Sequence, residues 1–493
     1  WIRLAAALVL TALGAAAVVD STPPVSPAST PTPDTREVAA STDTPPSSVA
    51  PASAAAPSAS APTIGSPSAA APTDPPAVVP ATTTAIRPGS INKTSLNLTA
   101  RYAVTLNVGW TSRSFGVSTI LTVTNTSGAA VDRLELNTIA ARLGGIRITV
   151  ATVDGKAVTP SISDQTIRLP LGGILDPGAS ATVRVDYRAT LRSTTSGSSW
   201  LFTRANGVLE AHRWIPWISR ATPFDRPNHG DPFVTPVSPS VTVRIVADRT
   251  IRWATTGEQT SPTGRTTTFG ASNVRDFVIV GAPDFRTVSA TLNGVAIHVW
   301  YRSGFPASTV LAAARTALSR ESRLLGAYPY KTYDLAQTAG GYGMESPGLT
   351  WIPTGAGSLP YLVAHETAHQ WFYGIVGNDQ ARNPYADEAA ADMVARHVLG
   401  LRRASRCATA RLDLTIYSYS ATCYYEVIYI QGGNFLDDTR ARIGSTAYWD
   451  ALRDYIAQYR FKLSSTKRLL DAIDAHTSLD LRPRYHTRFP SLY

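Results

Sequence analysis

Two histidines spaced four residues apart, His365 and His369, constrain this 493-residue chain more than any other feature of its sequence. On a helix this spacing places both imidazoles on one face, one turn apart, where the neutral rings can hold one Zn²⁺ together. Glu366 follows the first histidine directly, so its carboxylate can act as a general base on a water that the metal activates. A catalytic zinc also needs a third protein ligand, which Glu388 can supply after 18 intervening residues.

The residues around these groups predict two helices that bury the histidines in part. Six large apolar residues flank the histidine pair: Leu362, Val363, Trp371, Phe372, Ile375 and Val376. Asn383 as an N-cap, Pro384 in the first turn and Gly400 just past the end outline a second helix around the glutamate. An isolated H-E-x-x-H pattern is often a coincidence on a surface helix, but buried histidines and glutamates need partners. The flanks and the distant glutamate therefore favour a metal site.

At this point the chain resembles the aminopeptidase N family of gluzincin zinc metallopeptidases, whose zinc signature is H-E-x-x-H, 18 residues and then E. Just upstream, the segment from Gly341 to Ser346 is similar to the family's G-x-M-E-N motif, with Ser346 in place of the usual Asn. The resemblance implies that Gly343, Met344 and Glu345 lie in an edge strand that pairs with the substrate backbone. It also implies that the carboxylate of Glu345 binds the free α-amino group of a peptide.

A third segment, Y-I-Q-G-G beginning at Tyr429, is similar to the family's Y-x-K-G-A motif. The resemblance implies that Tyr429 stabilises the tetrahedral intermediate. The interval between Glu388 and this tyrosine is shorter than is usual in the family, so Tyr424 and Tyr425 are the alternatives. The resemblance covers roughly Asn92 to the C-terminus, which leaves no room for the helical repeat domain that caps the active site of larger members. A more open cleft is therefore expected.

The fold class expected is multidomain α/β, beginning with an antiparallel β-domain at residues 91–290. Apolar residues alternate with smaller or polar ones in three runs: Tyr102, Val104, Leu106 and Val108; Val183, Val185 and Tyr187; Val241, Val243 and Ile245. Residues 291–493 are then expected to form a thermolysin-like, mixed α+β catalytic domain that is mainly helical. In the family the β-domain contributes an acidic residue to the amine pocket. Glu210 is the candidate here, and a plain surface glutamate is the alternative.

One further acidic residue, Asp392, is a candidate for supporting a zinc ligand. Asp392 lies one helical turn after Glu388 and is placed to accept a hydrogen bond from a liganding imidazole, which would fix the histidine tautomer. A solvated aspartate on the helix face is the alternative.

Cys407 and Cys423 are the only cysteines in the sequence. In an exported protein such a pair indicates a disulfide, which would stabilise the fold by about 3 kcal/mol on the chain-entropy model. Two free thiols would instead suit a cytosolic protein.

The N-terminal part of the chain indicates export. Residues 1–19 are apolar apart from Arg3 and Thr11, and the small residues near their end are typical of a secretory signal with its cleavage site. An uncleaved membrane anchor is the alternative, although a spanning helix needs about 20 residues. Residues 20–90 are almost wholly Pro, Ala, Ser and Thr, so they are expected to be a disordered linker or stalk. The expected location is extracellular or in the cell envelope, with a membrane or cell-wall tether through this segment.

The formal net charge of +10 is spread along the chain without a concentrated basic run or a nucleic-acid motif. It indicates solubility and weak attraction to anionic envelope polymers, and no nucleic-acid partner is expected. With the resemblance, the sequence predicts an exported aminopeptidase with one Zn²⁺ per chain and peptide substrates. An endopeptidase with the same zinc centre is the first alternative, because Ser346 departs from the motif and the cap is missing. A tethered envelope-binding protein is the second, which the intact general base Glu366 argues against.

Overall fold

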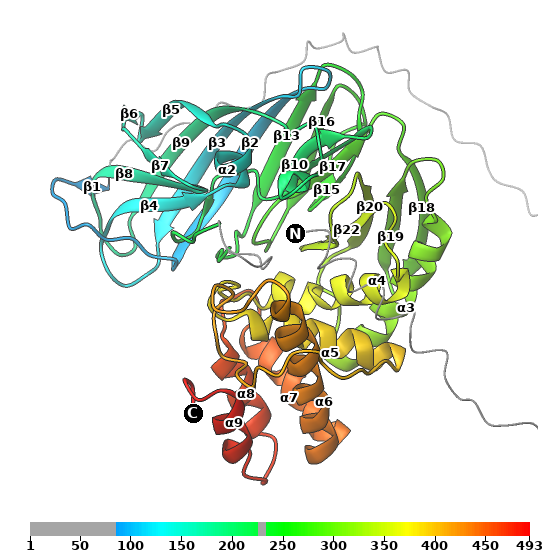
Figure 1. Ribbon diagram of the computed structural model, residues 1–493. Helices are drawn as coiled ribbons and strands as arrows, with labels where there is room; N and C mark the ends of the chain where they lie inside the picture. Colours follow the sequence, from blue (N-terminus) through cyan, green and yellow to red (C-terminus); the bar gives the residue numbers. More distant parts are fainter. Residues whose placement is uncertain (1–84, 225–232) are drawn as a thin grey trace, which may run out of the picture. The chain divides into compact units, whose positions relative to one another are not determined.

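The computed structural model of the chain describes residues 85–224 and 233–493 (Figure 1). The predicted signal or anchor at 1–19 and most of the predicted linker at 20–90 lie outside these ranges. Within the described ranges, no helix combines the length and the apolar character that crossing a membrane requires. All described residues belong to one compact unit.

The N-terminal region is built from three β-sheets. The largest has eight strands in the order β15-β16-β13-β2-β3-β9-β5-β6. Its strands are β2 (Leu98–Gly109), β3 (Ser114–Asn125), β5 (Arg147–Val153), β6 (Lys156–Ala157), β9 (Ser180–Thr190), β13 (Val241–Ala247), β15 (Glu258–Gln259) and β16 (Thr266–Ala271). A five-stranded sheet contains β1 (Ile86–Arg87), β4 (Val131–Asn137), β7 (Ser161–Ser163), β8 (Thr166–Leu175) and β12 (Trp217–Ile218). A four-stranded sheet contains β10 (Phe202–Ala205), β11 (Val208–Ala211), β14 (Arg252–Thr255) and β17 (Ile279–Ala282).

The sheets are stabilised by burial of the apolar residues that alternate with polar ones along the strands, as predicted. Along β2, Tyr102, Val104, Leu106 and Val108 are all buried while most residues between them are exposed. Each such side chain contributes roughly 1.5–3 kcal/mol when it is fully buried. The pairing is mostly antiparallel, as predicted, although β13 runs parallel to β2. Short helices, α2 (Ile139–Leu143) and η1 (Ser199–Leu201), connect the strands.

The ordered β-region begins before residue 91. β1 lies within the last residues of the segment predicted as a linker, and it pairs with β8. The backbone N–H groups of residues 91–93 then donate to the carboxylate of Asp132 at 2.7–2.8 Å. At the other end, β18 (Arg286–Leu292) begins just before residue 290 and already belongs to the next sheet.

A five-stranded mixed sheet opens the C-terminal region, in the order β18-β19-β20-β22-β21. Its further strands are β19 (Val295–Tyr301), β20 (Thr332–Thr338), β21 (Met344–Ser346) and β22 (Leu349–Pro353). The Met-Glu segment is thus a strand at the sheet's edge, as predicted, and it runs antiparallel to β22. Ala336, Leu349 and Trp351 of this sheet pack into the hydrophobic core of the N-terminal region, which joins the two regions.

Helices make up most of the remaining chain, which agrees with the fold class predicted. They are α3 (Ala307–Leu325), α4 (Leu359–Ala368), η2 (Gln370–Ile375), η3 (Pro384–Ala386), α5 (Glu388–Leu399), η4 (Tyr425–Gln431), α6 (Gly432–Ile443), α7 (Ser445–Gln458), α8 (Thr466–Asp474) and α9 (Arg482–Arg488). α4 packs against both α3 and α5. A second hydrophobic core lies among these helices and the sheet.

Two helix boundaries differ from the prediction. α4 ends at Ala368 instead of continuing through the apolar run, because Gly374 N–H donates to the carbonyl of His369 and the backbone at Phe372 and Tyr373 is not helical. Asn383 does not cap the second helix: residues 384–386 form a separate 3₁₀ turn, and α5 begins at Glu388. The C-terminal end agrees with the prediction, since Gly400 adopts φ 68° there.

The predicted disulfide is present between Cys407 and Cys423, whose Cα atoms are 5.8 Å apart. It lies in the irregular stretch between α5 and η4. Side chains tie this stretch to η4, because Arg403 pairs with Glu426 at 2.8 Å and Gln431 donates to the Cys407 carbonyl. The disulfide therefore supports the segment that carries Tyr429.

Candidate metal centre

The potential metal-ligating atoms of His365, His369 and Glu388 form one small triangle. The two Nε2 atoms are 3.2 Å apart, and each lies 3.3 Å from Oε2 of Glu388. His365 lies in the last turn of α4, His369 caps that helix, and Glu388 is the first residue of α5. All three residues are at most 9% exposed. The packing of two helices thus brings together the three ligands that the spacing predicted.

The triangle fits a zinc ion. Tetrahedral ligands at zinc distances of about 2.0–2.1 Å lie about 3.3 Å from one another, close to the separations seen. Nδ1 of His369 lies 2.9 Å from Oδ1 of Asp387, so a neutral ring that donates there presents an unprotonated Nε2 to the triangle. The group is therefore consistent with a single zinc site.

An excess of buried carboxylates around the imidazoles favours a cation. These carboxylates belong to Glu345, Glu366, Asp387 and Glu388. Burial alone would raise the pKa of Glu388, but hydrogen bonds with His365 and His369 lower it. Burial alone would lower the pKa of His369, whereas the charges of Asp387 and Glu345 raise it well above its ordinary value. A divalent cation would compensate this local negative charge.

Glu366 lies on α4 beside the triangle and is only 5% exposed. Its Oε2 has no hydrogen-bond partner in the described ranges. Burial raises the pKa of this carboxyl to about 7, and the neighbouring His365 and His369 oppose that rise. A Cβ on Gly343 would collide with Oε1 of Glu366 and with Leu362, so a larger residue there would displace the Glu366 carboxylate.

The carboxylate beside an imidazole of the triangle belongs to Asp387 and not to Asp392, the residue predicted for this role. Asp392 accepts a hydrogen bond from the Tyr361 hydroxyl and pairs with Arg396 at 2.6 Å. Nδ1 of His365 has no partner among the described residues, so Asp392 does not hold it. Asp392 is also fully buried, which excludes the alternative of a solvated aspartate. No residue spacing pointed to Asp387, because the turn η3 is what brings its carboxylate to His369.

Glu345 lies on the edge strand β21, close to the triangle. One of its carboxylate oxygens lies within 4.8 Å of ligand atoms of both His369 and Asp387. Its Oε1 accepts a hydrogen bond from Nε2 of Gln380 at 3.0 Å. The edge strand therefore carries a buried carboxylate directly beside the metal group.

The serine at position 346 does not disturb this strand. Gln370 donates from Nε2 to the carbonyl of Ser346 at 2.9 Å and accepts from the backbone N–H of Gly348 at 2.8 Å. The turn between β21 and β22 is thus fixed through backbone groups. The position of Glu345 consequently does not depend on an asparagine side chain at 346.

Among the three candidate tyrosines, Tyr429 faces the metal group. Its ring stacks on His365, with centroids 5.4 Å apart and planes at 25°. Burial raises the pKa of its hydroxyl well above the ordinary value, and the adjacent carboxylate of Glu388 raises it further. The hydroxyl of Tyr425 instead lies 3.2 Å from that of Tyr361, and Tyr424 packs edge-on against Tyr429 at 6.0 Å.

Glu210 is not a surface residue. It lies on β11 of the N-terminal region and is fully buried. Its Oε2 accepts a hydrogen bond from the backbone N–H of Ala339 at 3.0 Å, where β20 leads towards the Met-Glu strand. Its Oε1 lacks a partner among the described residues, and burial raises the pKa of the carboxyl.

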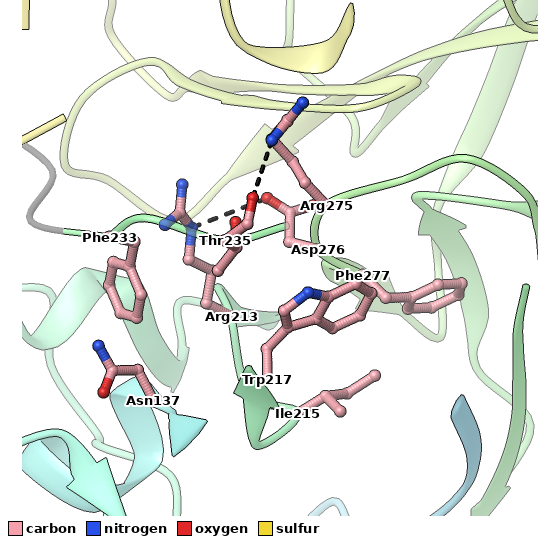
Figure 2. A pocket seen from close by; sticks show the side chains of 9 residues that line it. All are labelled: Asn137, Arg213, Ile215, Trp217, Phe233, Thr235, Arg275, Asp276 and Phe277. Carbon is pink, nitrogen blue, oxygen red and sulfur yellow. Dashed lines mark hydrogen bonds and ion pairs between the residues drawn. The ribbon is translucent and has the colours of Figure 1, made fainter. Parts of the chain in front are cut away.

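Sequence reasoning missed Arg213 and Gln380, which link the two regions of the chain. Arg213 donates to Oε1 of Gln380 at 2.9 Å and to the Tyr373 hydroxyl at 2.8 Å. It also pairs with Asp276, and both side chains line a small cavity in the N-terminal region together with Arg275 (Figure 2). No local pattern marks these residues, because they come from distant parts of the sequence.

Solved structures of M1 zinc metallopeptidases share this fold. A mutant of the enzyme from Deinococcus radiodurans matches with a TM-score of 0.61 at 19% sequence identity, over 80% of this chain and 95% of the other. A two-domain M1 zinc metallopeptidase mutant bound to L-tryptophan gives 0.61 at 20% identity, over 82% and 97% of the two chains. A Deinococcus radiodurans mutant bound to a Tyr-Ser-Ala substrate gives 0.58 at 18% identity, over 80% and 94%.

No protein-family model matches the sequence. The structural likeness nevertheless extends over most of the described chain, and it includes the N-terminal β-rich region as well as the helical one. It agrees with the resemblance that the zinc signature and the Met-Glu segment indicated. The chain therefore has the fold of the two-domain M1 zinc metallopeptidases.

Proposed function

We propose that this protein is an exported zinc aminopeptidase that removes single residues from the N-terminus of peptides. The observation that carries the proposal is the placement of Glu345 on an edge strand beside the triangle of His365, His369 and Glu388. A metal group alone would suit many hydrolases. A buried carboxylate at the end of a substrate-binding edge would also fix where the peptide begins.

The chain's residues have distinct roles in this proposal. Zn²⁺ held by the triangle would supply Lewis-acid polarisation and a lowered water pKa. Glu366 accepts a proton from the attacking water and delivers it to the leaving amine, and a pKa raised to about 7 by burial suits both transfers. The Tyr429 hydroxyl, which remains protonated, donates a hydrogen bond to the developing oxyanion.

Recognition of the peptide N-terminus follows from charge and strand geometry. β21 is the last strand of its sheet, so an extended peptide can add to it by backbone hydrogen bonds. The carboxylate of Glu345 then accepts a charge-assisted hydrogen bond from the protonated α-amine. Glu210, whose buried Oε1 has no partner among the described residues, would assist it. Similar structures bind L-tryptophan and a Tyr-Ser-Ala substrate, which supports free amino acids and short peptides as ligands.

Export is part of the proposal and is supported by two observations. The apolar segment at 1–19 has the composition of a secretory signal. The disulfide between Cys407 and Cys423 suits an oxidising compartment. Fractionation of cells that produce the full chain would test this part, because an exported protein appears in the envelope or medium and a cytosolic one does not.

The activity is tested by metal analysis of the purified protein alongside a panel of aminoacyl reporter substrates. One zinc per chain with cleavage of free-amine substrates is expected. N-acetylated peptides distinguish the alternatives, since an endopeptidase cleaves them as fast as free peptides. An envelope-binding protein would bind peptides without cleaving either form.

A further inference from the structure

One carboxamide, that of Gln380, contacts both the proposed amine-binding carboxylate and the carboxylate beside the metal group. Its Nε2 donates to Oε1 of Glu345 at 3.0 Å and to Oδ2 of Asp387 at 2.9 Å. The other carboxylate oxygen of Asp387 lies 2.9 Å from Nδ1 of His369. Gln380 is only 3% exposed, so these bonds form away from bulk water. A continuous chain of hydrogen bonds therefore runs from Glu345 to the ligand His369.

Arg213 fixes which end of this amide faces the carboxylates. A guanidinium has only donors, so the group that accepts from Arg213 must be the carbonyl oxygen of Gln380. The NH₂ group is thereby directed at Glu345 and Asp387. Arg213 itself donates to the Tyr373 hydroxyl at 2.8 Å. It also pairs with Asp276 at 3.7 Å (Figure 2).

The two hydrogen bonds that Gln380 donates also involve a second group of potential metal ligands. Glu345, His369 and Asp387 offer ligand atoms within 4.8 Å of one another, as a cation site would. Here the NH₂ group of Gln380 donates to both carboxylates of that group. A neutral amide thus donates one N–H bond to each of the two acids.

We infer that Gln380 is a positioning residue that couples recognition of the peptide amine at Glu345 to the orientation of the metal ligand His369 through Asp387. The inference rests on the proposed function. It assigns to one side chain, set by Arg213 of the N-terminal region, an effect on both substrate binding and metal retention. Replacing a residue that only fills space would not change substrate binding and metal retention together.

The test uses Gln380→Met in the full chain, which keeps the size of the side chain and removes both donated bonds. The KM for a free-amine reporter should rise about 10-fold, as expected for a lost hydrogen bond to a charged group. Release of zinc to a chelator should become about 10-fold faster, the lower end for losing an outer-shell partner. Gln165→Met is the matched control, because Gln165 is also buried and, among the described residues, its amide donates to the Thr222 carbonyl.

A double-mutant cycle shows whether the KM effect passes through Glu345. In a Glu345→Ala background, Gln380→Met should change KM less than about 2-fold but should still accelerate zinc release. Independent, multiplying effects on KM, or zinc release at the wild-type rate, would overturn the inference. Gln380→Glu gives a second test, since it retains an acceptor for Arg213 and can donate at most one hydrogen bond, when it is protonated, so at least one of the two changes is expected.

The outcomes separate this inference from the proposed function. Wild-type protein without zinc, or without cleavage of free-amine substrates, would overturn both. Normal wild-type protein with Gln380 variants that match it in KM and zinc release would overturn the inference alone. Unfolding of both Gln380 variants while Gln165→Met folds would show a purely structural role and would also overturn it.

Discussion

Nδ1 of His369 lies 2.9 Å from Oδ1 of Asp387, the residue directly before Glu388 in the chain. One short segment therefore supplies both a member of the metal triangle and the acid that orients another member. Carboxylate partners of this kind fix the histidine tautomer and raise its basicity. The aspartate one helical turn later, Asp392, is committed to Tyr361 and Arg396 instead.

Asp387→Asn should weaken zinc binding by about 10-fold or more, because the amide cannot act as an anionic partner for His369. Asp392→Asn is the matched comparison. It should lower the free energy of unfolding by about 3 kcal/mol, since it leaves the buried Arg396 without its counter-ion, and should weaken zinc binding less. Competition with a chelator and denaturant titration measure the two quantities. The reverse pattern would show that Asp392 supports the metal.

The zinc assignment itself is tested by His365→Ala and Glu388→Ala. Each removes one corner of the triangle, so each should lose stoichiometric zinc while the N-terminal sheets remain folded. Elemental analysis of gel-filtered protein measures the metal, and circular dichroism checks the fold. Persistence of one zinc per chain in both variants would contradict the assignment.

Glu366→Gln should keep zinc and reduce turnover by at least ~10²-fold, the lower end for general base catalysis. The substitution preserves size and every proposed ligand but removes the proton acceptor. Because the base must be deprotonated, wild-type kcat/KM should fall as pH decreases through its pKa. Burial raises that pKa to about 7, and the positive charge of bound zinc lowers it, so the acid limb is expected below about pH 7. A near-normal rate in Glu366→Gln would place the chemistry elsewhere.

The disulfide prediction concerns the support of Tyr429. Cys407→Ser should lower the free energy of unfolding by about 3 kcal/mol on the chain-entropy model. It should also reduce kcat more than zinc content, because the stretch between α5 and η4 that contains the disulfide contacts η4 through Arg403 and Glu426. Cys423→Ser and the double variant should behave like Cys407→Ser, since all three remove the same bond. Larger losses in the double variant would indicate separate roles for the two thiols.

The parts of the site that the sequence predicted depend on residues close together in the chain, and the parts that it missed depend on residues far apart in the chain. His365 and Glu366 lie on α4 and His369 caps it, so their spacing alone predicted the arrangement. β2 and β9 were predicted because alternation marks a strand locally. Arg213 and Gln380 are 167 residues apart, and only the packing of the two regions makes them neighbours. Asp387 was missed for a related reason: the 3₁₀ turn that precedes α5 turns its carboxylate to His369, and nothing in the spacing indicated that turn.

The last prediction distinguishes exopeptidase from endopeptidase through Glu345. This residue lies on the edge strand beside the triangle, and its carboxylate is buried. Glu345→Ala should raise KM and lower kcat/KM on free-amine substrates by ~10-fold or more, because hydrogen bonds to charged groups contribute roughly 1.5–3 kcal/mol. N-acetylated peptides should be poor substrates of both forms, since they carry no positive charge for the carboxylate to bind.

A purely structural Glu345 predicts a different pattern. If the carboxylate only anchored β21 through Gln380, its loss would depress all substrates alike and would lower the melting temperature. Glu345→Gln helps to separate the two cases, because the amide oxygen can still accept from Gln380 but carries no charge for the substrate amine. That variant should retain the wild-type melting temperature and still lose ~10-fold in kcat/KM on free-amine substrates. Equal cleavage of free and N-acetylated peptides by the wild type, unchanged in both variants, would replace the aminopeptidase proposal with the endopeptidase one.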